Sequence, residues 1–215
     1  KEFFVLEGAV QMGDRVCGLH SYGFIPRGHD PDTWTSEKGS TLLLFRHGWD
    51  DPNSGADCAE ALQVDTAAMP WDVSTYDPQL SHLRLARKIL RMGPQDSCRT
   101  FLLTGMPHGV PPVDALPAEY HDHAEEMFMI SGEMWAPEGC LRQGAYFYRP
   151  PAIVHGPHVS ELGFFQIMRS PGTNFIKTHW AETPSPLPIG AEYQPVMPAD
   201  TPEKWRRPWK GGAAF

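Results

Sequence analysis

Three stretches of sequence decide the fold: EMFMISGEMW (residues 126–135), GAYFYRPP (144–151) and GFFQIMRS (163–170). They are rich in Phe, Ile, Met and Tyr, and turn residues such as Gly and Pro separate them. Such spacing is typical of short strands in a sandwich or barrel. LSHLRLARKIL (80–90) alone has a helical period, and its strand-like continuation leaves it open between helix and strand. The sequence therefore predicts an all-β protein.

An internal repeat lies around these stretches. Shifted by 124 positions, residues 2–48 fall on residues 126–172 without a gap, and nine of the 47 positions are identical. Shared turn residues at a constant offset favour duplication over chance similarity. We expect residues 1–61 to be the C-terminal half of a degenerate first repeat, whose N-terminal half is missing from this chain. Residues 62–180 would form a complete second repeat, and 181–215 a Pro- and Trp-rich tail over the barrel.

Composition excludes several classes of protein. A net charge of −8 argues against nucleic acid or an anionic membrane surface as the main partner. No apolar run approaches the length of a membrane span, and no signal-peptide pattern opens the chain. The four cysteines lack a CxxC pair and suit a reducing compartment, so we expect a cytoplasmic protein. Serine-hydrolase, P-loop and Rossmann motifs are absent from the sequence.

The sequence HDHAEE (121–126) stands directly before a predicted strand. In an extended chain alternate side chains share a face, so His121, His123 and Glu125 would point the same way. Imidazole and carboxylate together suit Fe, Mn, Ni, Zn or Cu. His155 follows a Gly-x5-Pro turn and would lie on a neighbouring strand. A polar, solvated strand end is the alternative interpretation of the HxH pattern.

These two segments together resemble the motifs of the cupins, G-x5-H-x-H-x3-4-E-x6-G and G-x5-P-x-G-x2-H-x3-N. Six residues separate Glu125 from Gly132, and Gly144, Pro150 and His155 follow the second spacing. The resemblance covers almost all of the second repeat and what remains of the first. It implies a double-stranded β-helix (jelly-roll) barrel, here duplicated as in a bicupin, and a homodimer as the assembly.

The sequence departs from the motifs at several positions. Ala115, Ala152 and Val159 replace the expected glycines and asparagine, and the gap between His123 and Glu125 is short. Strict spacing would instead make Glu119 and His121 the two leading ligands. We prefer His121, His123, Glu125 and His155, because imidazole binds borderline transition metals better than carboxylate does. Glu119 and Glu126 are kept as reserves.

The first repeat provides an internal control. At the 124-residue offset Lys1 lies opposite Glu125, and Pro31 lies opposite His155. Neither residue can replace a metal ligand, although His29 nearby leaves a partial site open. We therefore expect the first repeat to be structural, with its strands used for packing or as a dimer surface.

The resemblance implies a metal centre with open positions, which favours catalysis or ligand capture. We expect a dioxygenase-type oxidoreductase with Fe(II), acting on a small carbonyl or phenolic molecule in an apolar pocket near Tyr146 and Phe147. Glu126 and Tyr148 are the candidate catalytic residues. A redox-neutral lyase or isomerase using Zn, Mn, Ni or Cu is one alternative, and a non-catalytic metal or ligand sensor is the other.

Overall fold

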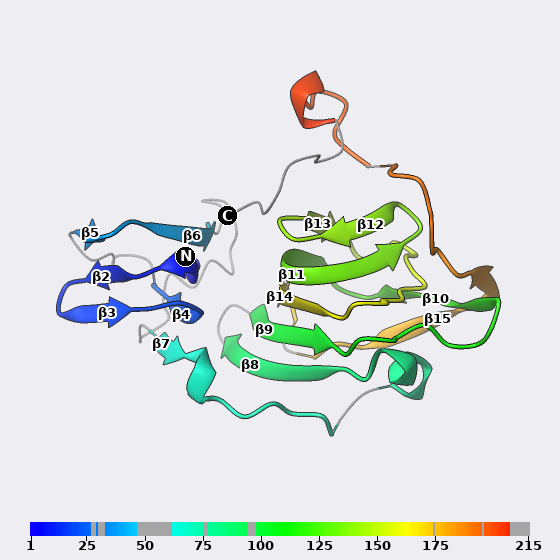
Figure 1. The fold of residues 1–215 in the computed structure, drawn as a ribbon, viewed down its shortest axis with the longest axis horizontal. Coiled ribbons are helices and arrows are strands. Elements are labelled where there is room, and N and C mark those ends of the chain that lie inside the picture. Colours follow the sequence, from blue (N-terminus) through cyan, green and yellow to red (C-terminus); the bar gives the residue numbers. More distant parts are fainter. Residues whose placement is uncertain are drawn as a thin grey trace.

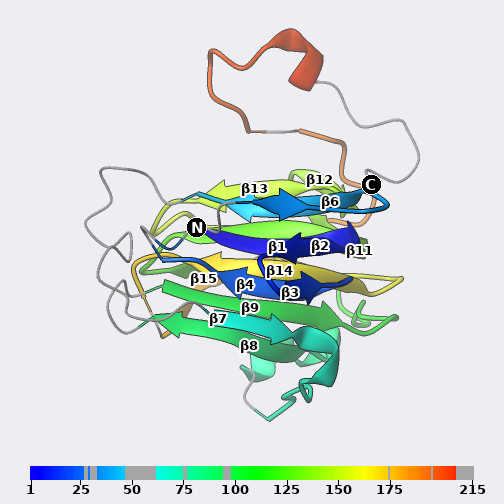
Figure 2. The same cartoon turned by 90° about the vertical axis from the view of Figure 1, so that its left-hand side faces the viewer.

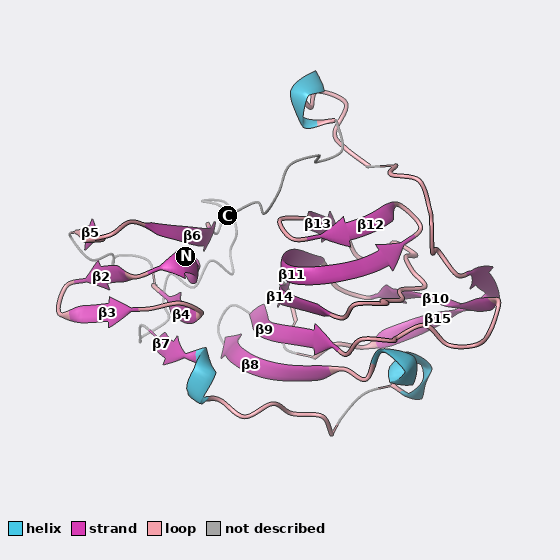
Figure 3. Cartoon of the chain, in the orientation of Figure 1, coloured by secondary structure: helices cyan, strands magenta, loops and turns pink. Residues whose placement is uncertain are grey.

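A computed structural model gives the fold of the chain. It describes residues 1–26, 29, 33–46, 62–74, 77–93, 98–173, 175–194 and 196–206. Strands dominate these residues, and the helices are short 3-10 turns (Figures 1 and 3). No helix within these ranges has the length and apolar character needed to span a bilayer. The all-β prediction is confirmed. Pro31, Cys58 and Trp209 lie outside the described residues.

Two sheets form the first part of the molecule. One has the order β6-β1-β4-β7 and the other the order β3-β2-β5. Their inward side chains make one apolar core, which includes Phe3, Val5 and Val10 of the first two strands. The strands are β1 (Glu2–Gly8), β2 (Val10–Met12), β3 (Arg15–Cys17), β4 (Ser21–Phe24), β5 (Trp34–Thr35), β6 (Ser40–Phe45) and β7 (Leu62–Asp65).

The second part has a larger sheet of order β12-β11-β14-β9-β8, with β13 also paired to β11, and a separate β10-β15 pair. A second apolar core, including Phe101, Met127 and Met168, lies on the inner face of the larger sheet. The strands are β8 (Ala86–Gly93), β9 (Cys98–Gly105), β10 (Ala115–His121), β11 (Glu125–Ala136), β12 (Gly139–Arg142), β13 (Tyr146–Arg149), β14 (Phe164–Ser170) and β15 (Thr178–Pro186).

The strand pairing repeats at the offset seen in the sequence. Glu2 pairs with Phe45 in β1 and β6, and 124 residues later Glu126 pairs with Arg169 in β11 and β14. A register shift interrupts each pair at the corresponding place, after Val5 and after Met129. Duplication, which we predict from the sequence, would produce this correspondence.

A pair of glycines also recurs at this offset. Gly8 and Gly132 both have positive φ, and a Cβ at either would overlap the carbonyl oxygen of Gly39 or Gly163, respectively. Only glycine allows this backbone approach without strain. Gly8 is the last residue of β1 and Gly132 lies within β11, and each approaches the glycine that precedes the antiparallel partner strand, so the same close backbone approach recurs in both sheets.

The two parts pack sheet against sheet (Figure 2). Phe4, Tyr22 and Phe24 of the first part share an apolar cluster with Leu102 and Ile167 of the second. The outer face of the larger sheet is therefore covered by the first part. This covered face is consistent with the packing role that we expect for the first repeat.

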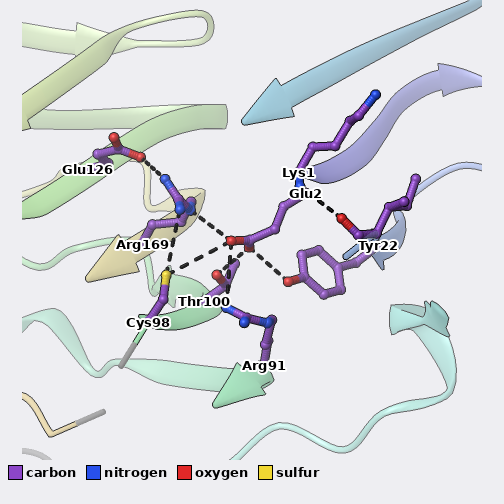
Figure 4. A network of polar contacts seen from close by, with 9 residues as sticks. Lys1, Glu2, Tyr22, Arg91, Cys98, Thr100, Glu126 and Arg169 are labelled. Carbon is purple, nitrogen blue, oxygen red and sulfur yellow. Dashed lines mark hydrogen bonds and ion pairs between the residues drawn. The ribbon is translucent and has the colours of Figure 1, made fainter. Parts of the chain in front are cut away.

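A buried polar network lies in the same interface (Figure 4). The Glu2 carboxylate, with none of its surface exposed, accepts hydrogen bonds from Tyr22 Oη at 2.8 Å, Arg169 Nε at 3.1 Å and Thr100 Oγ1. Arg169 also donates from Nη1 to Glu126 at 2.5 Å. Burial alone would lower the pKa of Arg169, but the negative charges of Glu2 and Glu126 raise it. The guanidinium thus stays charged and links the two parts.

In three segments tertiary structure decides or shifts the boundaries that the local sequence pattern predicts. In LSHLRLARKIL the 3-10 helix η2 (Pro78–Leu83) gives way to β8, and Arg84 between them has a positive φ of 47°. Strand β7 pairs with β4, although our predicted boundary places residue 62 in the second domain. Strand β15 extends to Pro186 and pairs with β10, so the first residues of the expected tail belong to a sheet. Beyond them, η3 (Glu203–Trp205) stands away from both sheets (Figure 1).

Candidate metal centre

Strand β10 positions the first two residues of the candidate centre. Glu119 and His121 are two residues apart, so both side chains point to the same face of the strand. His155 lies beside them because its backbone N–H donates to the carbonyl oxygen of Glu119 and its carbonyl oxygen accepts from the N–H of Glu119, both at 2.8 Å. Backbone pairing therefore brings together three side chains from two distant segments.

These side chains converge at a single point. One carboxylate oxygen of Glu119 and one ring nitrogen each of His121 and His155 all lie within 4.8 Å of one another. Glu125, the first residue of β11, completes the group: its two oxygens lie 3.7 Å from His121 Nε2 and 3.7 Å from His155 Nε2. All four residues line the same cavity.

Backbone hydrogen bonds fix how the two imidazole rings present their nitrogens. His121 Nδ1 donates to the carbonyl oxygen of Lys177 at 3.1 Å, and His155 Nδ1 donates to that of Ile153 at 2.9 Å. A carbonyl only accepts, so the proton of each neutral ring is on Nδ1 and Nε2 keeps its lone pair. Metal-binding histidines in proteins are typically oriented by such a hydrogen bond.

The charged groups around the centre keep it in a metal-binding protonation state. Burial, followed by the positive charge of Arg149, lowers the pKa of His155 to about 3, so its ring is neutral near pH 7. Burial would raise the pKa of Glu119, but the 3.2 Å hydrogen bond from His158 Nδ1 and the electrostatic influence of the surrounding histidines together outweigh burial, and the pKa is lowered. Neutral imidazoles and ionised carboxylates are the forms that bind a cation.

Arg149 and His158 form a second layer of contacts. Arg149 Nη1 bonds Glu125 at 3.4 Å, and its Nη2 bonds His158 Nε2 at 3.3 Å. His158 in turn bonds Glu119, so a chain of contacts runs from one carboxylate of the centre to the other. The guanidinium also lies 3.8 Å from the centre of the Phe147 ring. Both carboxylates are thereby held in place from outside the centre.

The centre opens into a cavity of about 360 Å³ inside the second part of the molecule. Its wall combines apolar and aromatic side chains, several of them from β9, β13 and β14, with polar ones that include Arg87, Arg99 and Arg149. Among the residues that line it are Leu83, Phe101, Leu103, Phe147, Phe164 and Met168. A small, largely apolar molecule could therefore bind next to the four side chains.

The structure brings together three of the four ligands that we prefer from the sequence, and puts Glu119 in the place of the fourth. His123 is buried and its ring stacks on that of His121 at 5.1 Å, but it does not line the cavity. The physical reason is that β10 ends at His121 and β11 begins at Glu125. Alternation stops between these strands, so His123 is not on the face that carries His121.

The two candidate catalytic residues lie on the other face of the sheet. Glu125 and Phe147 point into the cavity, so their neighbours Glu126 and Tyr148, which pair across β11 and β13, point outward. Glu126 bonds Arg169 in the interface, and Tyr148 is 51% exposed. Neither residue lines the cavity. Arg149 and His158 are two polar residues of the cavity to which our sequence reasoning assigned no catalytic role, and Asp77, Arg87, Arg99, Gln166 and Thr178 also line it.

The donor set fits a divalent transition metal. Two imidazole nitrogens and two carboxylates, without a thiolate, suit Fe, Mn, Zn or Ni rather than a structural zinc finger. Their lone pairs face one another within the cavity, where in the absence of a cation two carboxylates would repel. The fold and these side chains define the class of protein: a cupin-type barrel with a candidate metal centre.

Comparison with known families gives the particular group. The ChrR cupin-like domain family matches residues 59–171, just over half of the chain. The protein belongs to this family. The matched range includes Glu119, His121, Glu125 and His155 and ends just after β14. No curated protein matches the sequence.

Solved structures show the same architecture. A protein from Nostoc punctiforme PCC 73102, named "putative dioxygenase", has a TM-score of 0.63 and 21% identity, covering 86% of this chain and 65% of that one. This chain thus spans less than two thirds of that protein. Polyketide cyclase RemF from Streptomyces resistomycificus (TM-score 0.44, 14% identity, 56% and 84% coverage) and an acetylacetone dioxygenase from Acinetobacter johnsonii (0.34, 16%, 41% and 60%) are also similar. The first likeness shows the fold alone.

Proposed function

We propose that this protein is a metal-dependent cupin enzyme of the dioxygenase type, acting on a small carbonyl or phenolic molecule. The metal ligands in this proposal are Glu119, His121, Glu125 and His155. The observation that carries it is the pair of imidazole Nε2 atoms facing two carboxylates at the edge of a cavity with apolar and aromatic side chains in its wall. The dioxygenase name of the Nostoc punctiforme protein supports the reaction class.

A bound metal would supply Lewis acidity and open coordination positions for a chelating substrate and, with Fe(II), for O2. The chain's own residues have three tasks. The backbone pairing of Glu119 with His155 fixes the spacing of the donors. Arg149 and His158 hold the carboxylates in place, and the hydrogen bond from His158 helps to lower the pKa of Glu119. The apolar walls bind the substrate body and exclude water, which strengthens electrostatic interactions at the centre.

One feature favours a second candidate function, a redox-neutral lyase or isomerase. The centre has two carboxylates, and oxygen donors suit Mn(II) better than an all-imidazole set does. Substrate consumption without O2 uptake would favour this candidate.

The test combines metal analysis with oxygen consumption. The protein is purified without added metal, its metal content is measured by mass spectrometry, and O2 uptake is followed with β-dicarbonyl and phenolic compounds. We expect close to one metal ion per chain and uptake with at least one of the compounds. His155→Ala should lose most of the metal.

His179→Ala is the matched control. His179 lies near the same strand but bonds the exposed Asp122 at 2.9 Å instead of the centre. This variant should keep the metal of the wild type. Equal metal content in the two variants would refute the assignment of the centre, and a loaded protein inert toward every compound would refute the enzymatic function.

A further inference from the structure

Gln166 is a polar side chain in an otherwise apolar part of the cavity wall. It lies in the middle of β14 between Phe164 and Met168, the inward residues on either side. Across the sheet it pairs with Met129 on one neighbouring strand and Leu103 on the other. Its side chain is only 3% exposed and lines the cavity.

The buried amide oxygen of Gln166, Oε1, is without a hydrogen-bond partner in the described part of the chain. Two other buried polar groups of the same sheet, Thr100 and Arg169, both bond Glu2, whereas Ser170 Oγ at the end of β14 is likewise without a partner among the described residues. An unpaired buried acceptor costs roughly 1–3 kcal/mol. A group that costs stability inside a cavity can still be useful if a ligand supplies the missing donor.

Gln166 is also distant from the metal centre along the strand. Glu126, next to the centre's Glu125, pairs with Arg169, and Gln166 is three residues further along β14. At roughly 3.3 Å per residue the separation along the strand is about 10 Å. A molecule that reaches both must therefore have polar groups at two ends.

We propose that Gln166 is a specificity residue, which accepts a hydrogen bond from a hydroxyl or N–H group at the end of the substrate remote from the metal. This inference rests on the proposed function for the metal-binding end of the substrate. It narrows the substrate class to molecules with a chelating head, an apolar or aromatic body and a terminal hydrogen-bond donor. The walls formed by Phe101, Leu103 and Phe164 suit an aromatic body.

Two small probes isolate the contribution of the donor. p-Cresol and p-xylene have similar shape, but only p-cresol has a hydroxyl group. Their binding to metal-free protein is measured by calorimetry in the wild type and in Gln166→Met, which keeps side-chain length but removes the amide. We expect the p-cresol affinity of the variant to fall roughly three- to tenfold, while the p-xylene affinity is unchanged or higher.

Two control variants separate this inference from the proposed function. Met168→Leu alters the wall beside Gln166 but should keep the preference for p-cresol. His155→Ala should also keep it, because the probes need no metal. Metal loss in His155→Ala with no change in probe preference supports both ideas. An unaltered preference in Gln166→Met, or no p-cresol binding to the wild type, would overturn the role of Gln166 whatever the metal content.

Thermal unfolding supplies a readout that does not depend on ligands. Removing an unpaired amide should raise the melting temperature of Gln166→Met by about 2–4 °C. The side chain of Gln79 is exposed, so Gln79→Met should leave the melting temperature unchanged. A lower melting temperature for Gln166→Met would show that the amide stabilises the fold, and this would contradict the inference.

Discussion

Single side chains decide whether this barrel can bind a metal. The sequence identified three of the four residues that surround the candidate centre, His121, Glu125 and His155, because imidazole and carboxylate are rare in an apolar barrel. It favoured His123 over Glu119 because imidazole is the better ligand, whereas the structure places Glu119 at the centre. Both lie two residues from His121, and alternation treats them equally until the end of the strand is known. That end depends on the pairing of β10 with β15, which involves residues about sixty positions away.

The two neighbours of His121 give a direct test. In Glu119→Ala we expect most of the bound metal to be lost, because one oxygen donor and the group bonded to His158 disappear. In His123→Ala we expect metal content to stay near that of the wild type, because the ring does not line the cavity. The metal content of both purified variants, measured by mass spectrometry, shows which of the two residues is the ligand. The reverse result would restore His123 as the ligand.

Most of the features that the sequence predicts correctly are strands and turns. Runs such as GFFQIMRS became strands because alternating apolar residues fit a sheet buried on both faces. LSHLRLARKIL could not be assigned, since its spacing of leucines suits both periods. The structure divides it at Arg84, where a left-handed backbone separates a helical turn from a strand that pairs with β9. Long-range pairing of this kind is not visible in local periodicity.

Gly132, which lies within β11, allows a prediction about the stability of the larger sheet. Gly132→Ala should lower the free energy of unfolding by at least about 2 kcal/mol more than Gly172→Ala. Both positions have positive φ, of 81° and 87°, so they share the backbone strain of about 1–3 kcal/mol. Only at Gly132 would the new methyl group overlap backbone, at Gly163. Urea unfolding of the two variants measures the difference, and equal losses would disprove the steric argument.

The whole molecule depends on one interface, where the first part covers the outer face of the larger sheet. The 124-residue offset predicted corresponding strands in both parts, and the strands found there pair in corresponding registers. Face-to-face packing did not follow from the sequence. The residues that make it, such as Phe4 and Ile167, are indistinguishable in sequence from those that fill each core. The same holds for Glu2, which looks like an exposed residue near the start of a strand.

Glu2→Ala tests the interface. Removing this carboxylate leaves Arg169 buried with one partner fewer, and breaking a buried ion pair costs about 3–5 kcal/mol. We expect a loss of that size in the free energy of unfolding, measured by urea titration. Glu7→Ala, an exposed position on the same strand, should change it by less than about 0.5 kcal/mol. Similar losses in both variants would mean that the network does not stabilise the interface.

Strand β14 belongs to both the cavity and the interface, and this has a consequence for how the protein can change. Phe164, Gln166 and Met168 face the cavity, whereas Phe165, Ile167 and Arg169 face the first part. Even-numbered residues of β14 thus contribute to the cavity, and odd-numbered residues contribute to the interface. Mutations at the even positions can alter which molecule is accepted while the joint between the two parts remains intact. A library at those three sites would have to keep apolar side chains at Phe164 and Met168, which belong to the second core, and could vary polarity at Gln166.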